Sequence, residues 1–84
     1  MSQRDRIVNQ AKGALLSRRS LLLERERLAE REQLELQEIE RALRRLARGR
    51  WGVCLRCGHA IGTQLLRTFP ERRYCLSCGP TNGA

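Results

Sequence analysis

The clearest pattern in this chain is a run of apolar residues that recur every three or four positions in its first half. The members of this seam are Leu36, Ile39, Leu43 and Leu46. Their spacing is typical of a coiled coil and places all four side chains on one side of a helix. The pattern predicts a helix that ends near residue 48. Its seam needs a partner, which could be an earlier helix, a second copy of the chain or another protein.

A weaker apolar stripe precedes this helix. Ile7, Ala11 and either Ala14 or Leu15 indicate a first helix over about residues 4–16. Ser20 could cap a second helix over residues 21–48, which would give a lopsided helical hairpin. Because no strong turn sequence separates the two segments, we favour the alternative, a single nearly continuous helix. At 1.5 Å per residue such a rod of about 45 residues would be about 68 Å long.

The composition changes after residue 48. Residues 1–48 contain one glycine and no proline, whereas residues 49–84 hold the other six glycines, both prolines and all four cysteines. The segment Gly49-Arg50-Trp51-Gly52 predicts a helix stop followed by a turn. We therefore expect a mostly α protein in two parts: a helical rod or hairpin over 1–48, and a small treble-clef-like zinc finger over 49–84.

The cysteines form two pairs, Cys54-x-x-Cys57 and Cys75-x-x-Cys78, separated by residues 58–74. Four thiolates at this spacing predict one tetrahedral structural Zn²⁺. Such a site has no open coordination position, so the metal should build structure and not activate water. Gly58 and Gly79, which follow the pairs, are expected to supply positive φ angles.

Other uses of these cysteines are less consistent with the chain. Disulfides need an oxidising compartment, and nothing in the sequence indicates export. A redox Cys-x-x-Cys of the thioredoxin type needs a βαβ pattern, which is absent. His59 lies next to the first pair, but four thiolates complete the zinc site without it. We expect His59 at the surface.

Composition limits the function further. The chain has 84 residues, a formal net charge of +8 and only one Trp, one Tyr and one Phe. A core this small gains little from apolar burial, whereas a structural zinc contributes on the order of 10–16 kcal/mol to folding. No segment has the length and apolar character of a membrane span or a signal core. We expect a cytoplasmic protein with reduced thiols. Since no nucleophile–base pair, paired carboxylates or phosphate loop is found, we expect no enzymatic activity.

The positive charge lies at the two ends of the sequence. Residues 1–20 carry five basic groups and one acid, residues 21–48 seven of each, and residues 49–84 five basic groups and one acid. Basic ends permit contact with nucleic acid or with an acidic protein surface. Arg50, Arg56, Arg72 and Arg73 are candidates for a basic patch, but we favour ordinary solvated arginines there.

Three aromatic residues complete the predicted module. Trp51 stands at the junction between the helix and the cysteine turns, where we expect it to pack over the first turn. Phe69 precedes Pro70 and is expected in the small core. Tyr74 precedes Cys75 and is expected to pack and not to stack on a base.

Residues 36–78 as a whole resemble the DksA/TraR family of C4 zinc-finger proteins. The resemblance rests on the turn with Trp51 between two glycines, Cys54-x-x-Cys57-Gly58, Ile61-Gly62, Leu66, Pro70 and the closing Cys75-x-x-Cys78. It implies a regulator that binds bacterial RNA polymerase. Family members insert a helical rod into the secondary channel of the polymerase and alter promoter complexes without reading DNA sequence.

The resemblance also implies a tip motif, Asp-x-x-Asp-x-Ala, that approaches the catalytic magnesium of the polymerase. The nearest segment is Asn9-Gln10-Ala11-Lys12-Gly13-Ala14. Ala14 matches, while Asn9 and Lys12 replace the two acids. We expect Asn9, Lys12 and Ala14 to contact the partner with altered output. After Cys78 the helix that ends the family's finger is expected to be absent.

Two alternatives remain beside a polymerase-binding regulator. The basic ends suggest a zinc module that binds nucleic acid. The seam suggests a non-enzymatic adaptor that forms a homodimer through Leu36, Ile39, Leu43 and Leu46.

Overall fold

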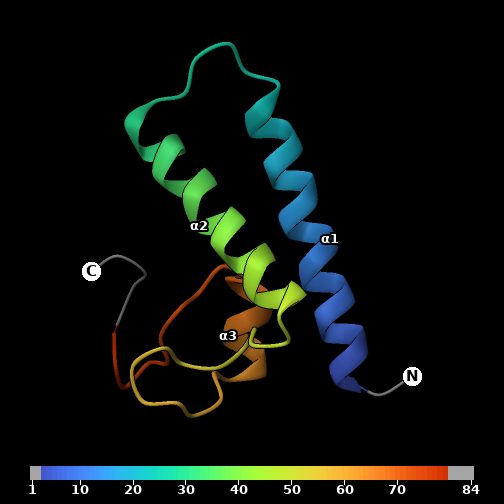
Figure 1. The fold of residues 1–84 in the computed structure, drawn as a ribbon, viewed down its shortest axis with the longest axis vertical. Coiled ribbons are helices and arrows are strands. Elements are labelled where there is room, and N and C mark those ends of the chain that lie inside the picture. The colour runs from blue at the N-terminus through green and yellow to red at the C-terminus, as the bar shows by residue number, and fades with distance from the viewer. Residues whose placement is uncertain (1–2, 80–84) are drawn as a thin grey trace.

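A helical hairpin and a cysteine-bearing module form the protein (Figure 1). The computed structural model describes residues 3–79, which contain α1 (Gln3–Leu23), α2 (Glu30–Ala47) and α3 (Thr63–Thr68). The two long helices run antiparallel, and the module lies at the end of the hairpin where α1 begins and α2 ends. The prediction of a mostly α fold is confirmed. The nearly continuous rod is wrong, since the longest dimension of the molecule is 38 Å.

The break between the long helices lies at residues 24–29 and not at residues 17–20. The serines at 17 and 20 are exposed, and helix propensity disfavours them only weakly, so α1 continues through them. This continuation brings Leu22 onto the face that α2 covers, where it is buried. Ser20 therefore does not cap a helix. Ala29 precedes α2, and its N–H donates to the Glu32 carboxylate at 3.0 Å.

The apolar seam of α2 packs against α1. Ile39 and Ala42 are fully buried beside Leu15 and Leu22 of α1. The rest of the seam is partly buried in the same cluster, with Leu46 at its lower end. Of the three partners that the sequence left open, the earlier helix occupies the seam. A homodimer through these residues stays a prediction, and it would require the hairpin to open.

The turn after α2 is as the sequence predicts. Arg50 N–H donates to the Arg45 carbonyl at 2.9 Å, and Gly49 N–H donates to the Leu46 carbonyl at 3.2 Å. These two bonds form a Schellman motif, which requires the left-handed conformation that Gly49 adopts at φ +72°. Gly52 follows at φ +89° and turns the chain into the first cysteine pair.

The module packs onto the first half of α1. Trp51, Ile61 and Leu66 are buried together with Ala11 of α1, and the Trp51 Nε1 donates to the Pro70 carbonyl at 2.8 Å. The predicted packing of Trp51 is thus confirmed. The expected boundary between residues 48 and 49 falls next to the end of α2, but this cluster joins the parts on either side of it.

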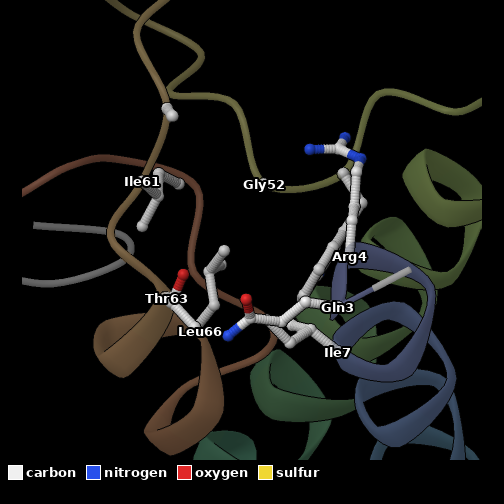
Figure 2. A pocket seen from close by; sticks show the side chains of 9 residues that line it. Gln3, Arg4, Ile7, Gly52, Ile61, Thr63 and Leu66 are labelled. Carbon is white, nitrogen blue, oxygen red and sulfur yellow. The ribbon is translucent and has the colours of Figure 1, made fainter.

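A cleft of about 270 Å³ lies beside this cluster, between the start of α1 and the module. Figure 2 shows Gln3, Arg4 and Ile7 facing the segment that carries Ile61, Thr63 and Leu66. α3, which the sequence did not predict, supplies Leu66 to both the cleft and the cluster.

Phe69 differs from the prediction. Its side chain is 49% exposed, and it is not part of the buried cluster that holds Trp51 and Leu66. The expected absence of a helix after Cys78 concerns residues 80–84, which lie outside the described residues. Within residues 3–79, no helix has the length and apolar character to cross a membrane.

Candidate metal centre

All four predicted ligands meet at one point. The four sulfur atoms of Cys54, Cys57, Cys75 and Cys78 lie within 4.8 Å of one another, and none forms a disulfide. The Cys57 and Cys75 sulfurs are 3.8 Å apart. A tetrahedral Zn²⁺ with Zn–S bonds of about 2.3 Å requires sulfur–sulfur distances of about 3.8 Å. The cluster therefore has the size of a four-thiolate metal site.

Backbone hydrogen bonds shape the first cysteine turn. Gly58 N–H donates to the Cys54 carbonyl at 3.0 Å, and Cys54 N–H donates to the His59 carbonyl at 2.8 Å. Gly58 has the predicted positive φ, +78°. His59 is exposed and offers only its backbone to the turn, as expected. Val53 and Ala60 form an antiparallel bridge that closes the base of this turn.

The second cysteine turn differs from the prediction at its glycine. Cys78 and Gly79 both donate their N–H to the Cys75 carbonyl, at 3.2 and 3.1 Å. Gly79 does not adopt a positive φ. A Cβ there would lie 3.4 Å from the Tyr74 ring, which is ordinary van der Waals contact, so neither backbone angle nor space requires a glycine at this position.

Arginines tie the two turns together. Arg56 Nη1 donates to the Cys78 carbonyl at 3.1 Å, and the Arg56 and Arg73 guanidinium groups lie 5.4 and 5.3 Å from the centre of the Tyr74 ring. Arg72 is buried and donates to the carbonyls of Tyr74, at 2.6 Å, and Gly79. The expectation of a solvated side chain is wrong for Arg72, since its guanidinium satisfies carbonyls of the second turn. No sequence signal separates it from the neighbouring Arg73.

The thiols influence one another's ionisation. Burial is the largest influence on Cys54 and opposes its ionisation. Backbone N–H groups of Cys57, Cys75 and Arg56 outweigh it and lower the pKa of the Cys54 thiol to about 5. Side-chain hydrogen bonds with Cys57 and Cys75 raise the pKa of Cys78 to about 12. Four neighbouring thiols cannot all ionise without a cation, and a bound divalent metal supplies that charge.

The donor set fits zinc. Four sulfurs in tetrahedral reach are the ligands that structural Zn²⁺ prefers, and no carboxylate or imidazole of the described residues joins the cluster. In that role the metal would join the two turns and stabilise the module, since all its coordination positions would be filled.

The residues expected at the tip lie elsewhere. Asn9, Lys12 and Ala14 are exposed on the first half of α1, beside the module end of the hairpin. Ala14 lines a shallow cleft with Arg67 and Pro70. The expectation that these residues form the tip is wrong, because the helix reverses much later. Their contact with a partner stays a prediction.

The segment that does form the tip was missed from the sequence. It reads Glu24-Arg25-Glu26-Arg27-Leu28-Ala29 and joins α1 to α2. Compared with Asp-x-x-Asp-x-Ala, it has an acid at the first position, Glu24, an arginine at the fourth, Arg27, and the matching alanine at the sixth, Ala29. The seam did not reveal this turn, since its register, extended backward from Leu36, meets Glu32, Ala29 and Arg25 before it reaches Leu22.

Comparison with known proteins gives the class of the fold. It is shared with Dks of Chlamydia trachomatis L2 (LGV434), which is described as an RNA polymerase binding protein and transcriptional regulator. The two structures superpose with a TM-score of 0.76 at 22% sequence identity, over 93% of this chain and 86% of that one. A hairpin of two long helices followed by a four-cysteine cluster is DksA-like, so the expected DksA/TraR resemblance is confirmed in fold and cysteine arrangement.

The similarity in amino-acid sequence covers a smaller part of the chain than the similarity in structure. A protein of unknown function from Aquifex aeolicus (strain VF5) is 42% identical over 43 residues, which are 51% of this chain and 30% of that protein. This chain thus matches less than a third of that relative's length. No protein-family model matches the chain.

Proposed function

We propose that this protein is a zinc-dependent, non-enzymatic regulator that binds bacterial RNA polymerase in the manner of DksA/TraR proteins. The observation that carries the proposal is the superposition with Dks over nearly the whole chain, together with four sulfurs that lie within 4.8 Å of one another. On this proposal the protein acts in the cytoplasm and reads no DNA sequence.

The geometry suits insertion into a narrow channel. The hairpin is two helices wide, and each helix has a diameter of about 10–12 Å with its side chains. The module lies at the opposite end from the 24–29 turn, so it can remain outside while the turn enters. In this proposal Glu24 and Glu26 are the acids that approach the catalytic centre, and Asn9, Lys12 and Ala14 contact the polymerase nearer the channel mouth.

The first experiment is a binding measurement. Zinc-loaded protein is incubated with bacterial RNA polymerase core at moderate salt, and its retention is compared with that of a chelator-treated sample. We expect retention of the zinc-loaded protein and competition by a known secondary-channel protein. Failure to bind core polymerase under these conditions would refute the proposal.

The second experiment tests the assignment of the tip. Arg27→Asp places an acid at the fourth position of the family's motif in the 24–29 turn. Asn9→Asp adds an acid in the segment 9–14 of α1. We expect Arg27→Asp to change single-round transcription more than Asn9→Asp does. If only Asn9→Asp acts, the turn is not the part that reaches the catalytic centre.

A further inference from the structure

An arginine groove lies where the end of α2 meets the second cysteine turn. It has a volume of about 400 Å³, and six of its seven lining residues are arginines: Arg41, Arg44, Arg45, Arg48, Arg50 and Arg73. Leu55 is the remaining lining residue. None of the four cysteines and no residue of the 24–29 turn lines this groove.

The helical positions explain how the groove forms. Four arginines share one face of α2 and its C-terminal cap, because they stand at i, i+3, i+4 and i+7. They are Arg41, Arg44, Arg45 and Arg48. That face is opposite to the seam that packs on α1. The array extends about 10 Å along the helix. Arg50, in the turn after α2, and Arg73, from the second cysteine turn, continue it beyond the helix end.

The positive charge of the groove is only partly balanced. Glu38 pairs with both Arg41 and Arg73 at 3.2 Å. Burial lowers the pKa of Arg45, and the neighbouring Arg73 and Arg41 add to that effect, while Glu38 opposes it. Among residues 3–79, the exposed side chains of Arg44, Arg48 and Arg50 have no hydrogen bond or ion pair. The groove thus carries an excess of cations that repel one another.

We propose that the arginine groove binds the phosphodiester backbone of nucleic acid without reading its sequence. Guanidinium groups match phosphate oxygens with two parallel hydrogen bonds. Phosphates recur every 3.4 Å of rise along a DNA strand, so the helical part of the array spans about three of them.

The lining of the groove also favours backbone contact. It has no aromatic residue and one apolar residue, Leu55, so it offers no wall on which a base could stack. Recognition would depend on charge, and affinity should fall steeply with salt. This inference does not rest on the polymerase as partner, and its test uses the protein and nucleic acid alone.

The test compares two double variants by fluorescence anisotropy with a labelled 20-base-pair duplex between 50 and 200 mM KCl. Arg44→Gln with Arg48→Gln removes two charges from the groove. Arg6→Gln with Arg67→Gln removes two exposed charges from α1 and α3 and is the matched control. All proteins are full-length and zinc-loaded, and circular dichroism checks their helix content.

We expect the groove variant to bind on the order of 50-fold more weakly at 0.1 M salt, with a salt slope shallower by about two. The control should stay within about threefold of the parent protein. Equal losses in both variants would overturn the proposal, as would an unchanged salt slope in the groove variant.

Competition identifies the source of the anion. Unlabelled duplex should displace the labelled duplex, whereas tripolyphosphate at equal phosphate concentration and polyglutamate at equal charge should not. Displacement by tripolyphosphate would make the groove a small-anion site, and displacement by polyglutamate would make it a surface for acidic proteins. Either result overturns the assignment to nucleic acid.

Discussion

The hairpin and the cysteine module are stabilised in different ways. In the hairpin, α1 and α2 bury a continuous apolar seam centred on Ile39, and exposed ion pairs such as Arg19–Glu40 add little. The module has no seam of its own. It depends on Trp51 and Leu66 packed against α1, on glycine turns and on four sulfurs placed for a metal. A repeated apolar pattern stabilises the hairpin, whereas a few individual residues stabilise the module.

Removing a metal ligand should have the largest effect, and this effect should differ most between the module and the hairpin. We expect Cys54→Ser to lose bound zinc and the order of the module, a loss on the order of 10–16 kcal/mol of apparent metal-binding free energy. Most of the helical circular dichroism should remain, since α1 and α2 hold most of the helix. His59→Ala is the control and should keep one zinc per chain. Full zinc content in Cys54→Ser, by metal analysis, would contradict the ligand assignment.

Truncating a side chain of the seam should destabilise the hairpin and leave metal binding unchanged. Ile39 is fully buried, so Ile39→Ala should lower the free energy of unfolding by about 2–5 kcal/mol. Leu34 lies on the same helix with 55% exposure, and Leu34→Ala should change stability by less than about 0.5 kcal/mol. Urea unfolding followed at 222 nm gives both values. Similar effects in the two variants would mean that the seam is not the core of the hairpin.

Replacing Gly52 should weaken metal binding by the module, with a smaller effect than the loss of a cysteine ligand. Gly52 has φ +89°, and a Cβ there would lie 3.4 Å from Leu66 Cδ1. The strain of about 1–2 kcal/mol predicts a metal affinity about tenfold lower for Gly52→Ala. Gly62→Ala is the control, because that position has no positive φ and open space around it. A chelator competition that finds equal affinities would show that the turn tolerates a side chain.

The smallest expected effect is a pH dependence at the start of α2. The hydrogen bond from Ala29 N–H, followed by contacts with Arg25, lowers the pKa of Glu32. A lowered carboxyl pKa contributes stability above the unfolded-state pKa, and this contribution is lost as pH falls through the folded-state pKa. The difference in urea midpoint between parent and Glu32→Gln should therefore shrink from pH 7 to pH 3. Glu30→Gln, two residues earlier and exposed, is the matched control for the loss of a carboxylate from the first turn of α2.

The sequence predicts the two regions unequally well. The seam and the helix stop at Gly49 depend on residues close together in the chain, and the four ligands are recognised from the repeated Cys-x-x-Cys spacing. The position of the hairpin turn does not follow from spacing. Helix propensity disfavours Ser17 and Ser20 only weakly, and the burial of Leu22 against α2 is a contact between segments distant in sequence.

The same limit applies around the metal centre. The burial of Arg72 and the exposure of Phe69 both depend on how segments distant in sequence pack together. Neighbouring residues of the same type, such as Arg72 and Arg73, have different roles that local sequence does not distinguish. The arginine groove likewise combines α2 with a turn some 25 residues later, so only the fold reveals it.

One consequence follows from the unbroken course of α1. This 21-residue helix rests its first half on the module through Ala11 and its second half on the seam through Leu22. One continuous helix therefore connects the module to the 24–29 turn. A tilt of about 10° at its base would swing its far end by about 5 Å. Any change in the module that tilted α1 would therefore displace the 24–29 turn, which carries Glu24 and Glu26 beside Arg25 and Arg27.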